Sequence, residues 1–324
     1  MADVTALGEL LIDFTPHGVS ESGNVLFERN PGGAPANVLA MVSKLGGSTA
    51  FIGKVGEDDF GRFLSDNLRE NGIDVSNIKY HREVHTTLAF VNLTPEGDRS
   101  FSFYRNPGAD MTLEPAEIDE ELIKNSSIFH FGSISMTDEP SRGATLRAIE
   151  VAKNAGVTVS YDPNLRPSLW RSLDEAKENI LRGLRYADIL KVSDEELGFI
   201  TGESDLAKGS AILARQGVSA IFVTLGAKGS FYRIGEKTGL RSTYDTKVID
   251  TTGAGDAFLG GVLYRVRDMS LPELQGLGDA EIAAIVDFAN AAGALAATQK
   301  GAIPALPTFE AIDLCMRVTP RLDA

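Results

Sequence analysis

The stretch Val248-Ile-Asp-Thr-Thr-Gly-Ala-Gly-Asp-Ala-Phe-Leu-Gly-Gly261 predicts a strand, a glycine-rich turn and a helix in direct succession. Residues 244–249 include Tyr, Thr, Val and Ile, which predicts the edge of a strand. Residues 257–267 carry apolar side chains at helical spacing, which predicts a helix. Between them, residues 253–256 are too rich in glycine for either element. We therefore expect a turn at this point, with a helix beginning directly after it.

This predicted turn has the features of an anion site. Glycine lets bare backbone approach a ligand, and a helix begins with unpaired N–H groups and a partial positive charge. Asp256 lies where an anion would arrive, and its carboxylate could take a proton from an attacking hydroxyl. An anion cradle beside a base suggests phosphoryl transfer to an alcohol. The same residues also fit an ordinary turn with Asp256 as helix N-cap, and this stretch alone leaves both interpretations open.

Composition narrows the class of protein. The 324 residues are 43% hydrophobic and 23% charged, which is typical of a globular protein with a sizeable core. The formal net charge of −14 argues against broad binding to nucleic acid or anionic membranes, so a polyanionic substrate must meet a locally positive site or a metal. The single cysteine, Cys315, excludes an internal disulfide and fits a reducing cytoplasm. We expect neither a signal peptide nor a membrane span.

Strand and helix patterns alternate along the chain, which predicts an α/β fold with a doubly wound, mostly parallel central sheet flanked by helices. The strands expected from apolar runs are residues 4–14, 48–55, 127–131, 157–161, 189–192 and 220–224. The helices expected from 3.6-residue periodicity end near residue 45 for the first and then cover 60–71, 140–154, 173–186, 257–267, 280–298 and 309–318.

Two segments do not follow this alternation. Residues 15–30 are polar and alternating, and residues 86–106 form a hairpin pattern around the turn Pro95-Glu-Gly-Asp98. We expect these two insertions to form a small β-sheet that stands apart from the main sheet and serves as a lid over the strand ends.

Several polar residues follow predicted strands or open predicted helices, and each has a structural alternative. Asp13 ends the first apolar run, where open parallel sheets bind ligands, although it could also cap a turn. Gly33 permits close backbone approach, and the amide of Asn37 could bind a polyol, although the segment also fits a simple loop into a helix. Ser193 and Glu196 match a capping box, which is the stronger interpretation of that pair.

Two long motifs resemble one family. Gly32-Gly-Ala-Pro-Ala-Asn37, continued by Gly53-Lys-Val-Gly-Glu-Asp-Asp-Phe-Gly61, resembles the first signature of the ribokinase-like carbohydrate kinases. Asp250-Thr-Thr-Gly-Ala-Gly-Asp256 resembles the second, and the likeness extends over residues 4–317. Within the family, Phe103-Tyr-Arg-Asn-Pro-Gly-Ala-Asp110 and Tyr161-Asp-Pro-Asn-Leu-Arg-Pro-Ser-Leu-Trp170 are similar to the fructokinase branch.

The resemblance implies one kinase domain over residues 1–324, with Asp256 as the base and the N–H groups of Gly253, Ala254, Gly255 and Asp256 as the anion hole. The positions that it implies for sugar binding are Asp13, Gly32, Gly33, Asn37, Arg105, Asn164 and Arg166. The positions that it implies for ATP are Ser193, Glu196, Thr224, Gly226, Gly229 and Asn290. For the two glycines of this set, the pattern alone favours a hairpin turn.

The resemblance also implies metals and a partner. Glu196 would hold Mg²⁺ through water, and Asp250 and Thr252 would lie beside a monovalent cation such as K⁺. The family's Asn-x-x-Glu pattern here begins with Ser193, which puts one contact to the nucleotide or the metal in doubt. A homodimer through the lid is expected, with Phe27, Phe90, Phe101 and Phe103 as candidates for its apolar face.

Two questions of function remain open at this stage. A relative that binds sugar or nucleotide without turnover would share the fold, but it would have no need of the carboxylate of Asp256. Among sugars, Arg105 and Arg166 could form a fork for the carboxylate of 2-keto-3-deoxygluconate. The motifs similar to fructokinases instead favour D-fructose, phosphorylated at O6 to fructose 6-phosphate.

Overall fold

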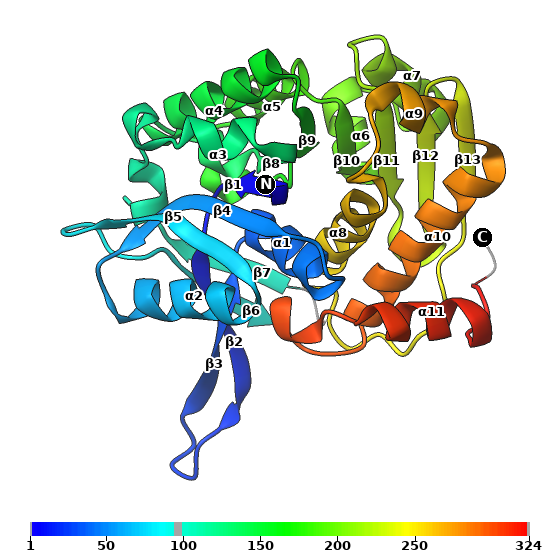
Figure 1. The fold of residues 1–324 in the computed structure, drawn as a ribbon. Coiled ribbons are helices and arrows are strands. Elements are labelled where there is room, and N and C mark those ends of the chain that lie inside the picture. Colours follow the sequence, from blue (N-terminus) through cyan, green and yellow to red (C-terminus); the bar gives the residue numbers. More distant parts are fainter. Residues whose placement is uncertain (1, 94–98, 323–324) are drawn as a thin grey trace.

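The main sheet crosses the centre of the molecule (Figure 1). The structure is a computed structural model that describes residues 2–93 and 99–322. The main sheet of the described chain has the strand order β13-β12-β11-β10-β9-β8-β1-β4-β5, and it is parallel from β5 to β11. Its strands are β1 (Ala2–Leu7), β4 (Thr49–Gly56), β5 (Ile73–His81), β8 (Ser126–Gly132), β9 (Thr158–Asp162), β10 (Ile189–Ser193), β11 (Ala220–Thr224), β12 (Ser230–Ile234) and β13 (Lys237–Arg241).

Helices cover both faces of this sheet and bury two separate cores, as predicted for a doubly wound fold. One core contains side chains of α1 (Ala34–Lys44), α2 (Asp59–Glu70), α8 (Ala254–Val266), α9 (Leu271–Gly276), α10 (Asp279–Ala296) and α11 (Phe309–Val318). The other contains side chains of α3 (Glu120–Lys124), α4 (Ser141–Ala155), α5 (Leu173–Leu184), α6 (Asp194–Thr201) and α7 (Leu206–Ala214). The chain leaves β1 toward β4 and later returns to β8, so the strand order reverses between β1 and β8, where such sheets bind ligands.

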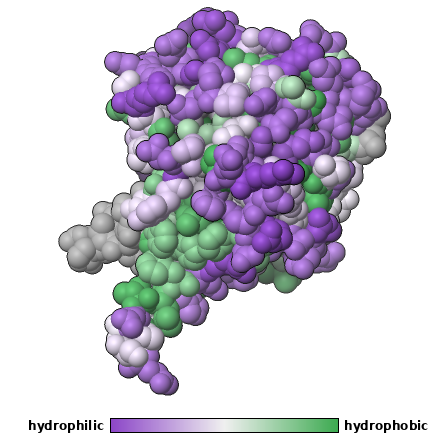
Figure 2. Space-filling view, turned by 90° about the vertical axis from the view of Figure 1, so that its left-hand side faces the viewer, coloured by the Kyte–Doolittle hydropathy of each residue, from purple (hydrophilic) through white to green (hydrophobic). Residues whose placement is uncertain are grey.

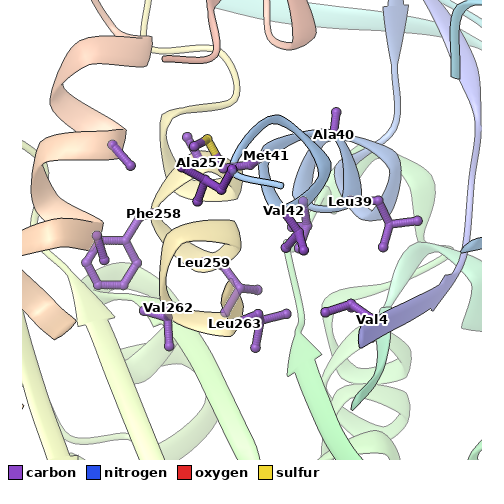
Figure 3. Close-up of a cluster of buried hydrophobic side chains, with 14 of the residues drawn as sticks. Val4, Leu39, Ala40, Met41, Val42, Ala257, Phe258, Leu259, Val262 and Leu263 are labelled. Carbon is purple, nitrogen blue, oxygen red and sulfur yellow. The ribbon is translucent and has the colours of Figure 1, made fainter. Parts of the chain in front are cut away.

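Helices α1 and α8 pack against each other in the first core (Figure 3). Leu39, Met41 and Val42 of α1 are fully buried, as are Leu259 and Val262 of α8. This packing joins two parts of the chain that lie far apart in sequence. It therefore brings together the N-terminal ends of both helices, where the motif segments 32–37 and 250–256 end.

A second sheet stands apart from the first, as the two insertions predict. Its strand order is β3-β2-β6-β7, with β2 (Leu11–Val19), β3 (Val25–Gly32), β6 (Leu88–Leu93) and β7 (Arg99–Tyr104). The β2–β3 hairpin projects from the body of the molecule (Figure 1). The expected turn at residues 95–98 lies outside the described residues.

The prediction of one strand over residues 4–14 was wrong. Strand β1 ends at Leu7 in the main sheet, and β2 begins at Leu11 in the second sheet, which also carries Asp13. The chain leaves the main sheet at Gly8, where a Cβ atom would lie 2.5 Å from Cγ of Pro35. An apolar run cannot reveal this change of sheet, because both segments are buried and β-prone.

The strand predicted at residues 244–249 was also wrong. In this segment Tyr244 forms an isolated bridge to Arg321, while Val248 and Ile249 are 60% and 51% exposed. Propensity for β structure measures fit to a half-buried pleated surface, and among the described residues no strand pairs with residues 245–249. The sequence patterns also missed β5, β13, α3, α7 and α9. None of the helices in the described ranges combines the length and apolar character that a bilayer crossing requires.

Candidate active site

Helix α8 begins at Ala254, earlier than predicted, and its N-cap is Gly253 with a φ of 74°. This left-handed conformation favours glycine, and a Cβ at Gly253 would lie 2.7 Å from Cβ of Ala302. Asp256 therefore lies in the first turn, and the alternative that it caps the helix is wrong. The first backbone N–H groups of α8 have no partner within the helix, as at any helix start, and they border a cavity.

Asp256 meets Asn37 at this point. The Nδ2 group of Asn37, in the first turn of α1, donates a hydrogen bond of 2.8 Å to Oδ2 of Asp256. Burial raises the pKa of the Asp256 carboxyl, while the bond from Asn37 and the charges of Lys191 and Arg166 act to lower it. The side chain is thus held in one orientation, and its proton affinity is higher than that of an aspartate in water.

A cavity of about 460 Å³ lies in front of Asp256. Of the residues proposed for sugar binding, Asp13, Gly33, Asn37, Asn164 and Arg166 line its wall. Leu11, Asp13 and Phe103 reach this wall from the second sheet, and Gly253, Gly255 and Asp256 reach it from the start of α8. The motif segments from both ends of the sequence therefore converge on one cavity.

Two glycines shape the sugar side of this cavity. A Cβ at Gly32 would lie 2.2 Å from Oδ2 of Asp13, so only glycine at this position leaves room for the carboxylate. Gly33 has a φ of 120°, and a Cβ there would lie 2.3 Å from the carbonyl oxygen of Glu9. Burial raises the pKa of Asp13 to about 7, against the opposing charge of Arg166.

Arg105 occupies a different position from the one expected. Its Nε group pairs with Oδ2 of Asp110 at 2.7 Å, and its guanidinium also donates to Thr137 and to the carbonyl oxygen of Ile134. The side chain is 3% exposed, and it is not on the cavity wall formed by the described residues. Arg105 thus joins the end of β7 to the body of the protein.

Sequence reasoning missed several residues that line this cavity, among them Lys191, Glu9 and Thr251. Lys191 of β10 donates a 2.9 Å hydrogen bond to Asp162 of β9, and its ammonium lies 3.0 Å from where a Cβ of Gly255 would be. Burial opposes its charge, but Asp162, Glu196 and Asp256 together raise the pKa of Lys191. Glu9 and Ile134 line the same cavity. The available signal for Lys191 was a lysine inside the apolar run of β10, and Glu9 likewise interrupts the apolar run 4–14.

A second cavity of about 410 Å³ adjoins the first. Of the residues proposed for ATP, Thr224, Gly226, Gly229 and Asn290 line it, together with apolar side chains such as Val248 and Phe258. The amide of Asn290 accepts from Ser230 and donates to the carbonyl oxygen of Arg241, which fixes its orientation. Thr251 and Gly255 line both cavities. Two ligands, one bound in each cavity, would therefore meet at the start of α8.

Two binding cavities that share one anion-binding helix start suit a transfer between two ligands, and comparison with known proteins agrees. A family model described as pfkB family carbohydrate kinase matches residues 1–309. The chain belongs to the pfkB family of carbohydrate kinases. It is 48% identical over 309 residues to a probable fructokinase-3 of Arabidopsis thaliana, a match covering 94% of this chain and 88% of that protein.

Solved structures of fructokinases share the whole fold. The crystal structure of fructokinase with bound ATP from Xylella fastidiosa has a TM-score of 0.89 and 33% identity, covering 98% of this chain and 99% of that one. A fructokinase double mutant from Vibrio cholerae O395, in its form with fructose, ADP and potassium ion, has a TM-score of 0.87 and 36% identity, covering 97% of both chains. These likenesses confirm the predicted family and fold class.

The side chains proposed to bind metals in this pfkB-family chain accept hydrogen bonds from backbone N–H groups. Ser193 and Glu196 form the predicted capping box, and the Glu196 carboxylate also accepts from the backbone N–H of Leu165 at 2.7 Å. Asp250 accepts from the backbone N–H groups of Thr252 and Gly301 at 2.7 and 3.1 Å. Within residues 2–93 and 99–322, no group of three or more His, Cys, Asp and Glu side chains could hold a metal by itself.

Proposed function

We propose that this protein is an ATP-dependent fructokinase, in which residues 1–324 form one cytoplasmic kinase domain. It transfers the γ-phosphoryl group of ATP to O6 of D-fructose and forms fructose 6-phosphate and ADP. The observation that carries the proposal is that Thr251 and Gly255 line both cavities beside Asp256. The 48% identity to a probable fructokinase, with 94% of this chain covered, supports the choice of fructose.

Fructose would occupy the cavity of about 460 Å³, where Asp13, Asn37 and the backbone at Gly33 offer partners for its hydroxyls. Its O6 hydroxyl would lie against Asp256. As the bond between O6 and phosphorus forms, the proton of O6 passes to the Asp256 carboxylate, and the bond between the γ-phosphorus and the bridging oxygen of ADP breaks. Asn37 leaves one carboxylate oxygen of Asp256 available for this proton, because its bond goes to Oδ2.

The charge of the phosphoryl group would be met by the backbone N–H groups at the start of α8 and by Lys191. The N–H groups carry the positive end of the helix dipole, and they are fixed before the substrate arrives. Lys191 adds a full charge next to Gly255. In a protein of net charge −14, this local positive site is what a polyphosphate requires.

ATP would bind in the second cavity, with its base against apolar side chains and its phosphates near Gly226 and Gly229. At Gly229, where φ is 92°, a Cβ would lie 2.0 Å from the carbonyl oxygen of Arg241, so bare backbone borders the ligand there. When bound, Mg²⁺ would be held by phosphate oxygens and through water by Glu196, and it would offset phosphate charge. We place a monovalent cation beside Asp250 and Thr252, as potassium is bound in the Vibrio cholerae fructokinase structure.

The pairing of Arg105 favours a neutral sugar over a sugar acid. Because Arg105 is bound to Asp110 and does not line the cavity formed by the described residues, it is not placed to join Arg166 in a fork for a carboxylate. Leu11, Asp13 and Phe103 reach the sugar cavity from the second sheet. We therefore infer that this sheet acts as the lid that excludes water during transfer.

We also propose that the protein forms a homodimer through the outer face of this lid. Val19, Val25, Phe27 and Tyr104 are 42–66% exposed there, and Figure 2 shows apolar surface gathered on the projecting hairpin and its base. Contiguous exposed apolar surface of this kind supports the proposed interface. The rings of Phe27 and Phe90 contact each other beneath it. Phe103 instead lines the sugar cavity, and the side chain of Phe101 lies outside the described residues.

The test compares kcat/KM for D-fructose, 2-keto-3-deoxygluconate and D-ribose under the same conditions, with ADP release as the signal and NMR to locate the phosphate. We expect fructose to be preferred and the phosphate to be on O6. A preference of more than about tenfold for the acid, which equals about 1.4 kcal/mol, would overturn fructose as substrate. Absence of ADP release with every sugar would overturn the kinase itself.

A further inference from the structure

The C-terminal end of the described chain closes one side of the nucleotide cavity. Leu322 lines this cavity together with Thr243, Tyr244 and Asn290. Two backbone hydrogen bonds hold the segment in place, from the N–H of Leu322 to the carbonyl oxygen of Thr243 at 3.0 Å and from the N–H of Asp245 to that of Pro320 at 2.9 Å. Residues 320–322 thus form a strap across residues 243–245.

Arg321 fastens this strap to α10. Its Nη1 group donates to Oδ1 of Asp287 at 2.7 Å, and its Nη2 group lies 2.6 Å from Oδ2. Arg241, at the end of β13, binds the same carboxylate through Nε at 2.8 Å and through Nη2. Partial burial opposes the charge of Asp287, but the two arginines lower its pKa, so the carboxylate stays ionised at neutral pH. Two-point pairs of this kind fix geometry as well as charge.

The same groups hold the residues that border the nucleotide. Asn290 lies one helical turn after Asp287 and donates to the carbonyl oxygen of Arg241. The guanidinium of Arg321 lies 5.0 Å from the centre of the Tyr244 ring and donates to its hydroxyl at 3.2 Å. Strap, β13 and α10 are therefore joined at one edge of the cavity, and none of these residues lines the sugar cavity.

We propose that residues 320–322 complete the wall against which the nucleotide base packs. Leu322 supplies an apolar contact to a planar base, and Arg321 is a positioning residue that acts by holding Leu322 and Tyr244 in place. The apolar side chains of Val248, Phe258 and Ala297, which line the same cavity, suit such a base. The inference rests on the proposed role of this cavity in binding ATP. It assigns the C-terminal segment to nucleotide affinity and leaves the sugar site and the transfer step unaffected.

The experiment uses the full chain and three variants: Arg321→Ala, Leu322→Ser and a chain that ends at Thr319. Arg317→Ala is the matched control, because Arg317 lies on the neighbouring helix α11, is 71% exposed and pairs with Asp313. The measurements are the Kd of ADP by calorimetry without sugar, the KM values for ATP and fructose, and kcat. We expect Kd for ADP and KM for ATP to rise at least about fivefold in the three variants. The KM for fructose and kcat should stay within about twofold, and the control should match wild type.

Two results would overturn the proposed role of the strap in nucleotide binding. One is unchanged ADP affinity in the truncated chain, and the other is a parallel loss of fructose affinity and kcat, which would indicate a general structural role. The single substitutions keep the test decisive if the truncated chain fails to fold, because Arg241 still binds Asp287 in both. Failure of the wild-type chain to bind ADP would instead overturn the proposed function, so the two failures are distinguishable.

Discussion

Gly260 of α8 lies against Met41 of α1 so closely that a Cβ at position 260 would be 2.5 Å from the Met41 Cβ and 2.9 Å from the carbonyl oxygen of Val38. Each of the two residues lies four positions after a residue of the site, since Met41 follows Asn37 and Gly260 follows Asp256. The close approach of the helices therefore sets the 2.8 Å hydrogen bond between Asn37 and Asp256 one turn earlier. A packing contact in the core thus fixes the geometry of the proposed base.

Gly260→Ala should separate the two helices. We expect it to lower the free energy of unfolding by about 1–3 kcal/mol, as overpacked core positions do, and to lower kcat because Asn37 loses its position against Asp256. Gly198→Ala is the control, because Gly198 is helical and a Cβ there would meet no heavy atom within 4 Å. Urea unfolding and steady-state kinetics measure both effects. Equal behaviour of the two variants would contradict the role of this contact.

Activity should depend on pH through Asp13 and Asp256. Burial raises the pKa of Asp13 to about 7 and also raises that of Asp256. Asp256 can take the proton only when it is ionised, and an ionised Asp13 is the stronger acceptor for sugar hydroxyls, so kcat/KM for fructose should fall as the pH drops through the pKa of Asp13 at about 7. In Asp13→Asn, the part of this dependence that belongs to Asp13 should disappear. A flat wild-type profile between pH 5.5 and 8 would count against both assignments.

The free energy of unfolding should fall as the pH rises, whereas kcat/KM for fructose should rise. The folded state keeps the proton of Asp13 up to about pH 7, whereas an unfolded aspartate loses it near its ordinary pKa of 3.8. The contribution of Asp13 to the free energy of unfolding is therefore fully present below about pH 4 and is lost as the pH rises through 7. Relative to wild type, ligand-free Asp13→Asn should gain stability between pH 5 and pH 8. Denaturant unfolding at the two pH values measures this gain, and an unchanged difference would contradict the raised pKa.

Removal of the charge of Lys191 should slow transfer. Lys191→Gln keeps a donor for Asp162 but loses the positive charge beside Gly255, so we expect kcat to fall at least about tenfold with little change in fructose affinity. Lys54→Gln is a matched control, because both side chains are 9% exposed and each pairs with a carboxylate, that of Lys54 being Glu117. Similar kcat values in the two variants would remove Lys191 from the mechanism.

Phe27→Asp should convert the proposed dimer into a monomer. Phe27 is 42% exposed on the outer face of the second sheet, and a charge there would be buried by a partner. Light scattering at micromolar concentration should give twice the mass of one chain for wild type and for Leu314→Asp, a control that is 59% exposed on α11. A wild-type mass equal to one chain would contradict the dimer.

Much of the fold follows from local pattern. The capping box of Ser193 and Glu196 begins α6 where the sequence predicts a helix start. Two glycines in the left-handed conformation, Gly72 and Gly156, follow α2 and α4 close to the predicted helix ends. Apolar runs and helical periodicity reflect burial, and burial repeats along a doubly wound sheet. The same signal could not separate β1 from β2, because their membership of different sheets depends on the contact of Gly8 with Pro35 across the fold.

The site was predictable where a motif carries it and not elsewhere. Asp13, Asn37 and Asp256 belong to such motifs, and they meet in one cavity. Lys191 belongs to neither motif. Its pairing with Asp162 arises because β10 lies next to β9 in the sheet, and the strand order is not written in either motif. Arg105 was expected beside the sugar because of its charge and its motif. Its pairing with Asp110, five residues later, is a local contact that a charge pattern alone does not distinguish from a ligand contact.

The central claim is that Asp256 takes the proton of the attacking hydroxyl. The most direct measurement compares Asp256→Asn with wild type for kcat with fructose and for the binding of fructose and ADP by calorimetry. Asparagine keeps the shape of the side chain but cannot accept the proton, so we predict that kcat falls at least about a hundredfold while both affinities change little. A variant that turns over at nearly the wild-type rate would contradict the account.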